Sequence, residues 1–361
     1  MKKRIGIFFL FTVFIFLLVS CPGSDTPAVA EDTLPDPLLT DYATMIPDAN
    51  LRTAIKDTLA ASYSISKDWG AITQDDLRQI TTLVAIAKNI AVIDGIGLCS
   101  NIQVLRLVGN SIVDIKPAVS LGALVDCTFR DNKITTIAPL KDLPHPEILE
   151  FFGIMGNSVA YSDWSTVITP SKFPKLHGFS ISGTTADGST TLFTNAQLES
   201  LLSNPPAGGL EDIQISRFPD IDETAFATLF DTYISANSST LLGMYIIDCS
   251  ISNASLLKLA TLSKLQYLIL SGNSDITELA NLASIIGTSG YTSLNVSRTA
   301  ITDLAILQAA YDAGGFHQAD ASINITNCGL SIAPASANRA VVDYLIGQGV
   351  RIDWEAGNTI D

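Results

Sequence analysis

The sequence is poor in histidine and in positive charge. It holds only 3 His in 361 residues, and 21 Lys and Arg face 36 Asp and Glu, which gives a formal net charge of −15 at pH 7. So few histidines, scattered along the chain, do not predict a His-rich metal site. An acidic surface without a basic patch repels phosphate backbones. We therefore expect no metal, no cofactor and no nucleic-acid partner.

Recognisable catalytic motifs are also missing. There is no G-x-S-x-G, no phosphate-binding loop and no paired-Cys zinc spacing, and His145, His177 and His317 stand far apart. Two acidic clusters, 75–76 and 220–223, suit calcium or helix starts, and the helical patterns that follow them favour helix capping. No nucleophile, base and orienting group cluster together, so the sequence does not predict an enzyme. Hydrophobic residues make up 47% of the chain and charged residues 16%, which excludes a disordered chain.

The N-terminus has the pattern of a secretion signal. Lys2, Lys3 and Arg4 precede an apolar run over 5–19, which ends in Leu-Val-Ser-Cys at 18–21. This ending resembles the lipobox of bacterial lipoproteins, and the resemblance implies a signal peptide at 1–20, lipidation of Cys21 and a membrane anchor. A plain signal anchor with an incidental Cys is the alternative. By resemblance to enteric lipoproteins, Pro22 after the Cys indicates the outer membrane or cell surface. Residues 21–44, rich in Pro and acid, are expected to form a flexible tether.

A repeat runs through the rest of the chain. Apolar residues stand at i, i+3, i+5, i+10, i+13 and i+19, and a polar residue stands at i+8, in three frames spaced by 22 residues that begin at Ile80, Ile102 and Leu124. Longer copies keep the first part of the pattern and begin at Leu149, Leu176, Leu210, Leu241, Leu265, Tyr291 and Asp320. This pattern resembles the leucine-rich repeat, and the 22-residue form resembles bacterial internalin-like proteins.

The resemblance implies an α/β leucine-rich repeat solenoid. Its short strands form a parallel concave sheet, and the convex side carries turns, 3₁₀ pieces and helices, with room for full helices only in the longer later copies. We expect a helical N-terminal cap at 45–79, about ten repeats at 80–335 and a C-terminal cap at 336–361. Predicted convex helices cover 195–203, 223–234, 253–262, 277–286 and 302–313. Within the C-terminal cap, 340–346 is helical in pattern and 350–354 forms a closing strand.

Repeat positions assign structural roles to two residue types. An amide at i+8 offers both donors and acceptors to adjacent turns, so Asn110, Asn132, Asn157 and Asn273 are expected to form a ladder. Lys88 and Phe218 occupy the same position in the first and sixth copies, which predicts irregular turns there. The cysteines after Cys21 fall on repeat positions and are expected to be buried free thiols: Cys99, Cys127, Cys249 and Cys328.

The concave face remains as the candidate binding surface. Positions i+2, i+4 and i+6 of each strand face away from the core. Tyr245, Ile247, Tyr267 and Ile269 should then form one exposed patch on neighbouring strands, unless the register slips or a loop covers them. Further candidate ligand contacts on this face are Phe151 with Met155, and Arg106 with Arg130.

Together these features predict a non-enzymatic, lipid-anchored protein of the bacterial cell envelope. It would bind a protein or glycan through its concave face, as an adhesin does, and would be monomeric by default. Fold alone does not fix function, so this step rests on analogy. An envelope scaffold facing the periplasm fits the same sequence, and a hydrolytic enzyme is the alternative that the missing motifs disfavour.

Overall fold

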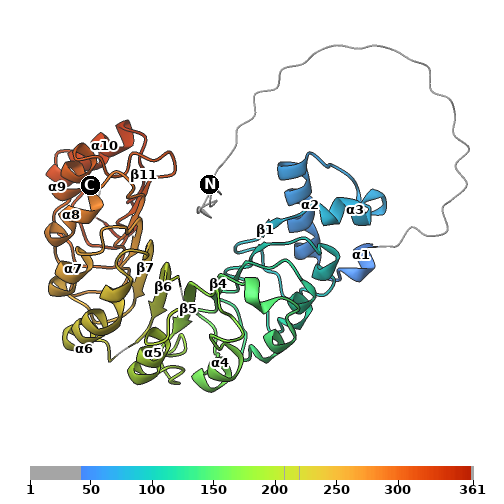
Figure 1. The fold of residues 1–361 in the computed structure, drawn as a ribbon. Coiled ribbons are helices and arrows are strands. Elements are labelled where there is room, and N and C mark those ends of the chain that lie inside the picture. The colour runs from blue at the N-terminus through green and yellow to red at the C-terminus, as the bar shows by residue number, and fades with distance from the viewer. Residues whose placement is uncertain (1–41, 207, 219, 359–361) are drawn as a thin grey trace, which may run out of the picture.

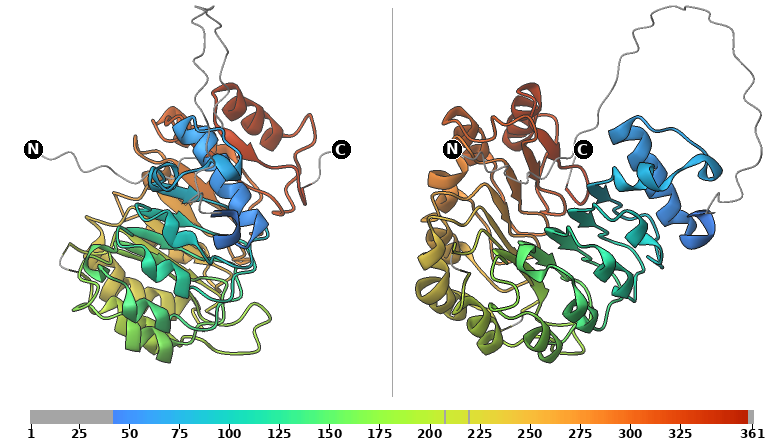
Figure 2. Two further views of the ribbon diagram at one scale, coloured as in Figure 1. Left: turned by 90° about the vertical axis from the view of Figure 1, so that its right-hand side faces the viewer. Right: turned by 45° about the vertical axis from the view of Figure 1, so that its right-hand side comes forward.

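The protein is a curved coil with one continuous sheet on its inner side (Figures 1 and 2). The computed structural model describes residues 42–358, apart from 207 and 219. In this part of the chain, eleven strands pair in sequence order, and every pair is parallel. The strands are β1 (Thr82–Val84), β2 (Val104–Arg106), β3 (Asp126–Thr128), β4 (Phe151–Gly153), β5 (Gly178–Ser182), β6 (Asp212–Ser216), β7 (Gly243–Ile247), β8 (Tyr267–Ile269), β9 (Ser293–Asn295), β10 (Ser322–Asn324) and β11 (Arg351–Asp353).

The second residue of each strand points into the core, and the residues on either side of it face the concave side. Leu83, Leu105 and Cys127 pair in register, and none is more than 1% exposed. The same row continues through Phe152, Phe179, Ile213, Met244, Leu268, Leu294 and Ile323. Successive side chains of a strand point to opposite faces of the sheet, so the side chains on the face that lines the core must be apolar. The predicted coil geometry is therefore confirmed.

The convex side changes from 3₁₀ turns to helices along the chain (Figure 1). The first repeats carry only η2 (Ile96–Leu98), η3 (Lys116–Ser120), η4 (Ala138–Asp142) and η5 (Pro146–Ile148), as expected for copies this short. The later repeats carry α4 (Tyr161–Val167), α5 (Asn195–Leu202), α6 (Glu223–Leu229) with the π-helical η6 (Phe230–Ile234) and η7 (Ser235–Asn237), α7 (Asn253–Leu259), η8 (Ala280–Leu282) with α8 (Ala283–Ile286), and α9 (Ala305–Asp312).

Two of these helices differ from the prediction. The helix expected over 277–286 is a 3₁₀ turn followed by a single α-helical turn. Helix α4 was not predicted, and its N-cap Ala160 makes no side-chain capping bond, so the sequence carries no start signal there. Where capping residues do occur, they act as expected. Thr194 and Gln197 form a capping box at the start of α5, and Asp222 accepts a bond from the N–H of Ala225 at the start of α6.

Asparagine side chains connect adjacent turns of the coil. The amide of Asn157 donates to the carbonyl oxygens of Phe129 and Ile154, and its Oδ1 accepts from the N–H of Ile134 at 2.9 Å. Asn110, Asn132 and Asn273 bridge their neighbouring turns in the same way. Asn358 adds a further bridge, from Ile325 to Leu330, inside the C-terminal cap. These bonds satisfy backbone groups that would otherwise be buried without partners.

At the first repeat a carboxylate from the N-terminal cap also bonds to the turn of the coil. Asp48 caps helix α2 (Ala49–Tyr63) by accepting from the N–H groups of Asn50 and Leu51. Its second oxygen accepts from Ala91 at 2.8 Å and from Val92 at 3.0 Å, in the turn that follows Lys88. Partial burial works against ionisation, yet these four N–H donors hold the pKa of Asp48 below its ordinary value. The N-terminal cap is thereby tied to the first repeat.

Caps close both ends of the coil. The N-terminal cap comprises α1 (Tyr42–Met45), α2, η1 (Trp69–Ala71) and α3 (Gln74–Arg78), with Leu51, Ile55 and Leu59 buried. Its first described helix, α1, starts at Tyr42. The C-terminal cap holds α10 (Ala337–Gly347) and β11, the helix and closing strand expected there. The signal peptide, Cys21 and the tether up to residue 41 lie outside the described residues.

The four predicted core cysteines are free and buried. The parallel sheet, the stacked turns and the amide ladder together define the fold as a leucine-rich repeat solenoid, an α/β architecture with its helices on the convex side.

Candidate ligand-binding face

The concave face consists of two rows of side chains in register. One row holds the first residue of each strand and the other holds the third. The first row runs Thr82, Val104, Asp126, Phe151, Gly178, Asp212, Gly243, Tyr267, Ser293, Ser322 and Arg351. The second runs Val84, Arg106, Thr128, Gly153, Ser180, Gln214, Tyr245, Ile269, Asn295, Asn324 and Asp353. Apolar, charged and neutral polar residues therefore occupy successive zones.

Glycines in the middle of the sheet make room for a ring that lies along it. A Cβ added at Gly178 would stand 2.6 Å from the Phe151 ring, and one added at Gly153 would stand 3.1 Å from it. The same Cβ at Gly153 would be 2.6 Å from Thr128 Oγ1. Phe151 is consequently half-buried across its neighbours and does not project as a free anchor.

A charged network fills the concave surface from β2 to β7. Arg106 and Asp126 form an ion pair at 2.6 Å. Arg130 donates to the Oε1 of Gln214 at 3.2 Å, and its guanidinium lies 5.7 Å from the centre of the Tyr245 ring. Gln214 in turn donates to the carboxylate of Asp212. Long side chains thus lie flat across several strands and cover one another.

This network contains polar atoms that are buried without a partner. In the described part of the chain, five of the seven such side-chain atoms lie here: Asp126 Oδ1, Thr128 Oγ1, Arg130 Nε, Ser180 Oγ and Asp212 Oδ1. Burial raises the pKa of Asp212 to about 7, against the opposing influence of Gln214 and Arg130. Burial also raises the pKa of Asp126, although Arg106 lowers it. The centre of the concave face is largely closed, because Asp126, Thr128, Ser180 and Gln214 are all buried there.

A groove opens beyond this network, over β7 to β11. Its volume is about 300 Å³, and it is lined by Tyr267, Ile269, Ser293, Asn295, Ser322 and Asn324 together with Tyr245, Asp320, Arg351, Asp353 and neighbouring backbone. Tyr267, Ile269, Asn295 and Asn324 are all half-buried, so part of each side chain is open. This is the region in which the sequence placed its strongest aromatic and aliphatic candidates.

The eight candidate ligand contacts separate into distinct environments. Tyr267 and Ile269 line the groove, and Ile247 is half-buried beside it. Arg106 and Arg130 belong to the charged network, and Phe151 lies over the glycines. The structure brings Tyr245, Tyr267 and Ile269 together, since all three line the groove, and it places Arg130 over the Tyr245 ring.

Two of the expectations about exposure are wrong. Tyr245 is only 7% exposed, because the Arg130 side chain covers its ring. Met155 is 3% exposed, because the turns on both sides close over it: Asp131 N–H donates to the Met155 carbonyl, and Gly156 N–H donates to Ser182 Oγ. Strict alternation predicts which side of the sheet a residue faces, but not what covers it there.

An apolar zone on the first two strands was not predicted as a site. Val84 is 46% exposed and Ile86 is 38% exposed, and the half-buried Val104 and Val108 lie on the next turn. These residues hold outward positions of the repeat. The sequence could have indicated this zone, because it has aliphatic residues at outward strand positions, where polar residues are usual.

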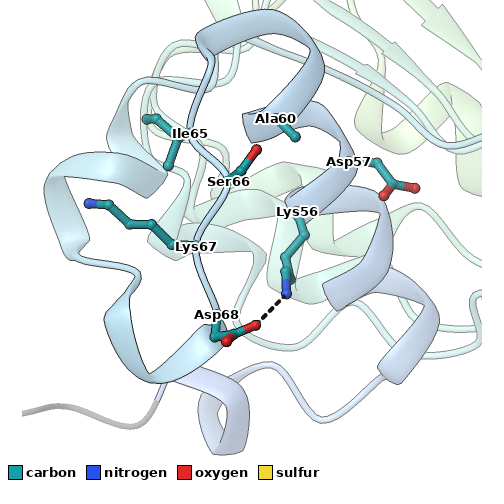
Figure 3. Close-up of a pocket in the computed structure, with 7 residues that line it drawn as sticks. All are labelled: Lys56, Asp57, Ala60, Ile65, Ser66, Lys67 and Asp68. Carbon is teal, nitrogen blue, oxygen red and sulfur yellow. Dashed lines mark hydrogen bonds and ion pairs between the residues drawn. The ribbon is translucent and has the colours of Figure 1, made fainter. Parts of the chain in front are cut away.

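A second recess lies in the N-terminal cap (Figure 3). It has a volume of about 340 Å³ and lies between α2 and the segment 65–68. Lys56 pairs with Asp68 at 3.5 Å and Lys67 pairs with Asp76 at 2.8 Å, so both cations at this recess have acidic partners. Its lining is mostly charged and exposed, which makes it a weak candidate for a ligand site.

The remaining candidates for chemistry have structural roles. The Asp76 carboxylate accepts a hydrogen bond from the backbone N–H of Thr73, the N-cap residue of the same helix. The Glu223 carboxylate accepts from the hydroxyls of Ser252 and Ser255. Among the described residues no three His, Cys, Asp or Glu side chains gather as metal ligands would. Over the same residues no helix combines the length and the apolarity of a membrane span.

Comparisons with known proteins return solved structures only. No protein-family model matches the chain, and no curated protein does. An internalin, InlF, from Listeria monocytogenes is 20% identical with a TM-score of 0.38, over 89% of this chain and 92% of the internalin. Internalin C2 from the same species is 20% identical with a TM-score of 0.37, over 74% and 92%. A structure of TLR13 in complex with ssRNA13 is 14% identical with a TM-score of 0.37, over 72% and 40%. These low values support no conclusion about a ligand.

Proposed function

We propose that the protein is a non-enzymatic binding module whose ligand, a protein or a glycan, contacts the concave face. The groove over β7 to β11 is the observation that carries the proposal. Its partly open Tyr267 and Ile269 stand beside small hydroxyl and amide side chains. Aromatic anchors with a few placed polar groups are typical of recognition surfaces. The closed central network supports the same location, since it leaves little for a ligand to contact there.

The proposal includes attachment to the bacterial envelope. The lipobox-like ending at residues 18–21 supports a lipid on Cys21 and a place in the outer membrane or on the cell surface, as for an adhesin. Incorporation of a labelled fatty acid by the wild-type chain, and its loss in Cys21→Ser, would support the anchor. Mild protease treatment of intact cells distinguishes a surface binder, which is digested, from a periplasm-facing scaffold, which is protected.

Binding is tested with paired variants of the full chain in mild detergent. Tyr267→Ser with Ile269→Ser removes the groove's apolar anchors and should abolish capture of a specific ligand from host or envelope extracts. Leu257→Ser is the matched control, because Leu257 is 59% exposed on the convex helix α7 and lies away from the groove. Equal capture by the groove variant and the control would show that the concave face is not the binding surface.

A further inference from the structure

The groove carries two amide donors that are arranged as a pair. Asn295 and Asn324 occupy the same register position on the adjacent strands β9 and β10. Each uses its Oδ1 to accept the N–H of the residue two positions on, Ser297 at 2.9 Å and Thr326 at 3.0 Å. Within the described part of the chain, the NH₂ group of neither asparagine has a hydrogen-bond partner. The turn bonds fix the side chains, and the donors remain available in the groove.

The spacing of these donors favours a particular kind of ligand. Adjacent parallel strands lie about 4.8 Å apart. Two donors at this separation match the distance between alternate equatorial hydroxyl oxygens of a pyranose ring. Carbonyls on one side of an extended peptide repeat every second residue, a distance of about 6.6 Å, and match less well.

Acceptors and a flat apolar surface lie beside the two amides. Asp353 follows Asn324 on the next strand in the same row, and Asp320 stands at the edge of the groove. Serines 293 and 322 share a hydrogen bond at 3.1 Å on the other row. On β8 the Tyr267 hydroxyl is bonded to the side chain of Thr292, which is 1% exposed, so the ring is held in place while part of the side chain stays open. An ordered ring of this kind offers a stacking surface at a low cost in conformational entropy.

The charges in and around the groove further restrict the class of ligand. The groove holds Asp320, Asp353 and one cation, Arg351, whose guanidinium lies 3.7 Å from Asp353. The chain as a whole has a net charge of −15, which disfavours an anionic ligand. The floor between Tyr267 and Asp353 consists of neutral hydroxyl and amide groups.

We infer that the groove over β7 to β11 is a subsite for a neutral oligosaccharide, with one sugar ring stacked on Tyr267 and hydroxyls bound by Asn295, Asn324 and Asp353. The inference rests on the proposed function and specifies its ligand class. A cationic peptide attracted to Asp320 and Asp353 is the competing occupant.

The test presents the full chain in mild detergent to an array of neutral and anionic glycans and to hexalysine, followed by calorimetric titration of the best neutral oligosaccharide. Tyr267→Ala should weaken that binding about tenfold or more, whereas Tyr267→Phe, which keeps the ring, should retain most of it. Leu257→Ala on α7 is the control and should bind as the wild type does. Melting curves of all variants verify that they fold.

The substitutions Asn295→Asp and Asn324→Asp together test the contribution of the two amide NH₂ donors. Each aspartate keeps an oxygen for the backbone N–H of Ser297 or Thr326, so the turns are preserved while the NH₂ groups are lost. We expect at least a tenfold loss of oligosaccharide affinity. Binding of no neutral glycan, binding that Tyr267→Ala leaves unchanged, or tighter binding of hexalysine than of any glycan would each overturn the inference. If extracts still yield a glycan-free protein whose capture depends on Tyr267 and Ile269, the proposed function stands while the glycan subsite falls.

Discussion

Asp212 should make the protein less stable as the pH rises, and Asp212→Asn should remove that dependence. The carboxylate has one oxygen buried without a partner, next to the Arg130–Gln214 pair. Burial raises its pKa from 3.8 to about 7. In the folded protein it therefore keeps its proton up to near neutrality, whereas the unfolded chain loses the proton near the ordinary value.

The sign follows from proton linkage. Between pH 3.8 and about 7 the folded state binds the extra proton, so the free energy of unfolding falls as the pH rises. The contribution is complete below the unfolded pKa and is lost as the pH passes through the folded pKa. A shift of about three pKa units at 1.36 kcal/mol each gives about 4 kcal/mol as an upper bound, of which about 2 to 3 kcal/mol falls between about pH 5 and pH 8.

Urea denaturation of wild type and Asp212→Asn at about pH 5 and about pH 8 measures this difference. The wild type should lose about 2 to 3 kcal/mol more than the variant over this interval. Every other titratable group is common to both proteins, and Asn has nearly the shape of Asp. If both proteins lose the same free energy between the two pH values, Asp212 is ionised in the folded state and the account of the charged network is wrong.

Three further predictions test the fold and the site. Asn157→Ala should destabilise the protein by about 1 to 3 kcal/mol in urea denaturation, because the carbonyls of Phe129 and Ile154 and the N–H of Ile134 lose a buried partner. An unchanged midpoint would show that the asparagine ladder does not stabilise the fold. Tyr245→Ser should lower Tm by several degrees, because the ring is buried under Arg130. Tyr267→Ser should lower Tm less, because part of that side chain is open; equal shifts would contradict the assigned difference in cover. Alkylation should fail in the folded protein at the four buried thiols, Cys99, Cys127, Cys249 and Cys328, and burial raises the pKa of Cys99 and Cys249 to about 12. In urea without a reductant all four thiols should react. Labelling of fewer than these four would show a disulfide.

The coil was predictable because one physical requirement repeats in each turn. Every strand must place its central side chain in a shared core, so Leu83, Leu105 and their successors recur at fixed spacing and reveal the fold. Asn110, Asn132, Asn157 and Asn273 were predictable for a related reason, since a buried turn needs a side chain with both donors and acceptors. The starts of α5 and α6 could be predicted from the capping residues Thr194 and Asp222, and α4 was missed because Ala160 gives no such signal.

The candidate site was predictable only in outline. Alternation placed Tyr245 and Met155 on the correct side of the sheet, but their cover comes from Arg130 and from neighbouring turns, which lie far away in the sequence or depend on rotamers. The link between Arg130 and Gln214 joins residues 84 positions apart and crosses from the turn after β3 to β6. No repeat periodicity encodes such a contact, because each of these residues occupies an outward position where any polar type is allowed.

The charged network and the groove are best understood as parts of one surface. Arg106 reaches Asp126 on the next strand, and Arg130 reaches Gln214 and Tyr245 on β6 and β7, and these long side chains close the centre. Toward the C-terminus the outward rows contain Ser293, Ser322, Asn295 and Asn324, which are too short to cover one another. The sheet floor therefore stays accessible there, and Tyr267 stands at the border between the two zones. Shortening Arg130 to Ala should therefore expose Tyr245 and extend the groove toward β6, which would appear as tyrosine fluorescence newly sensitive to a soluble quencher. Arg78→Ala on α3, which removes an exposed pair with Asp75, should leave the quenching unchanged.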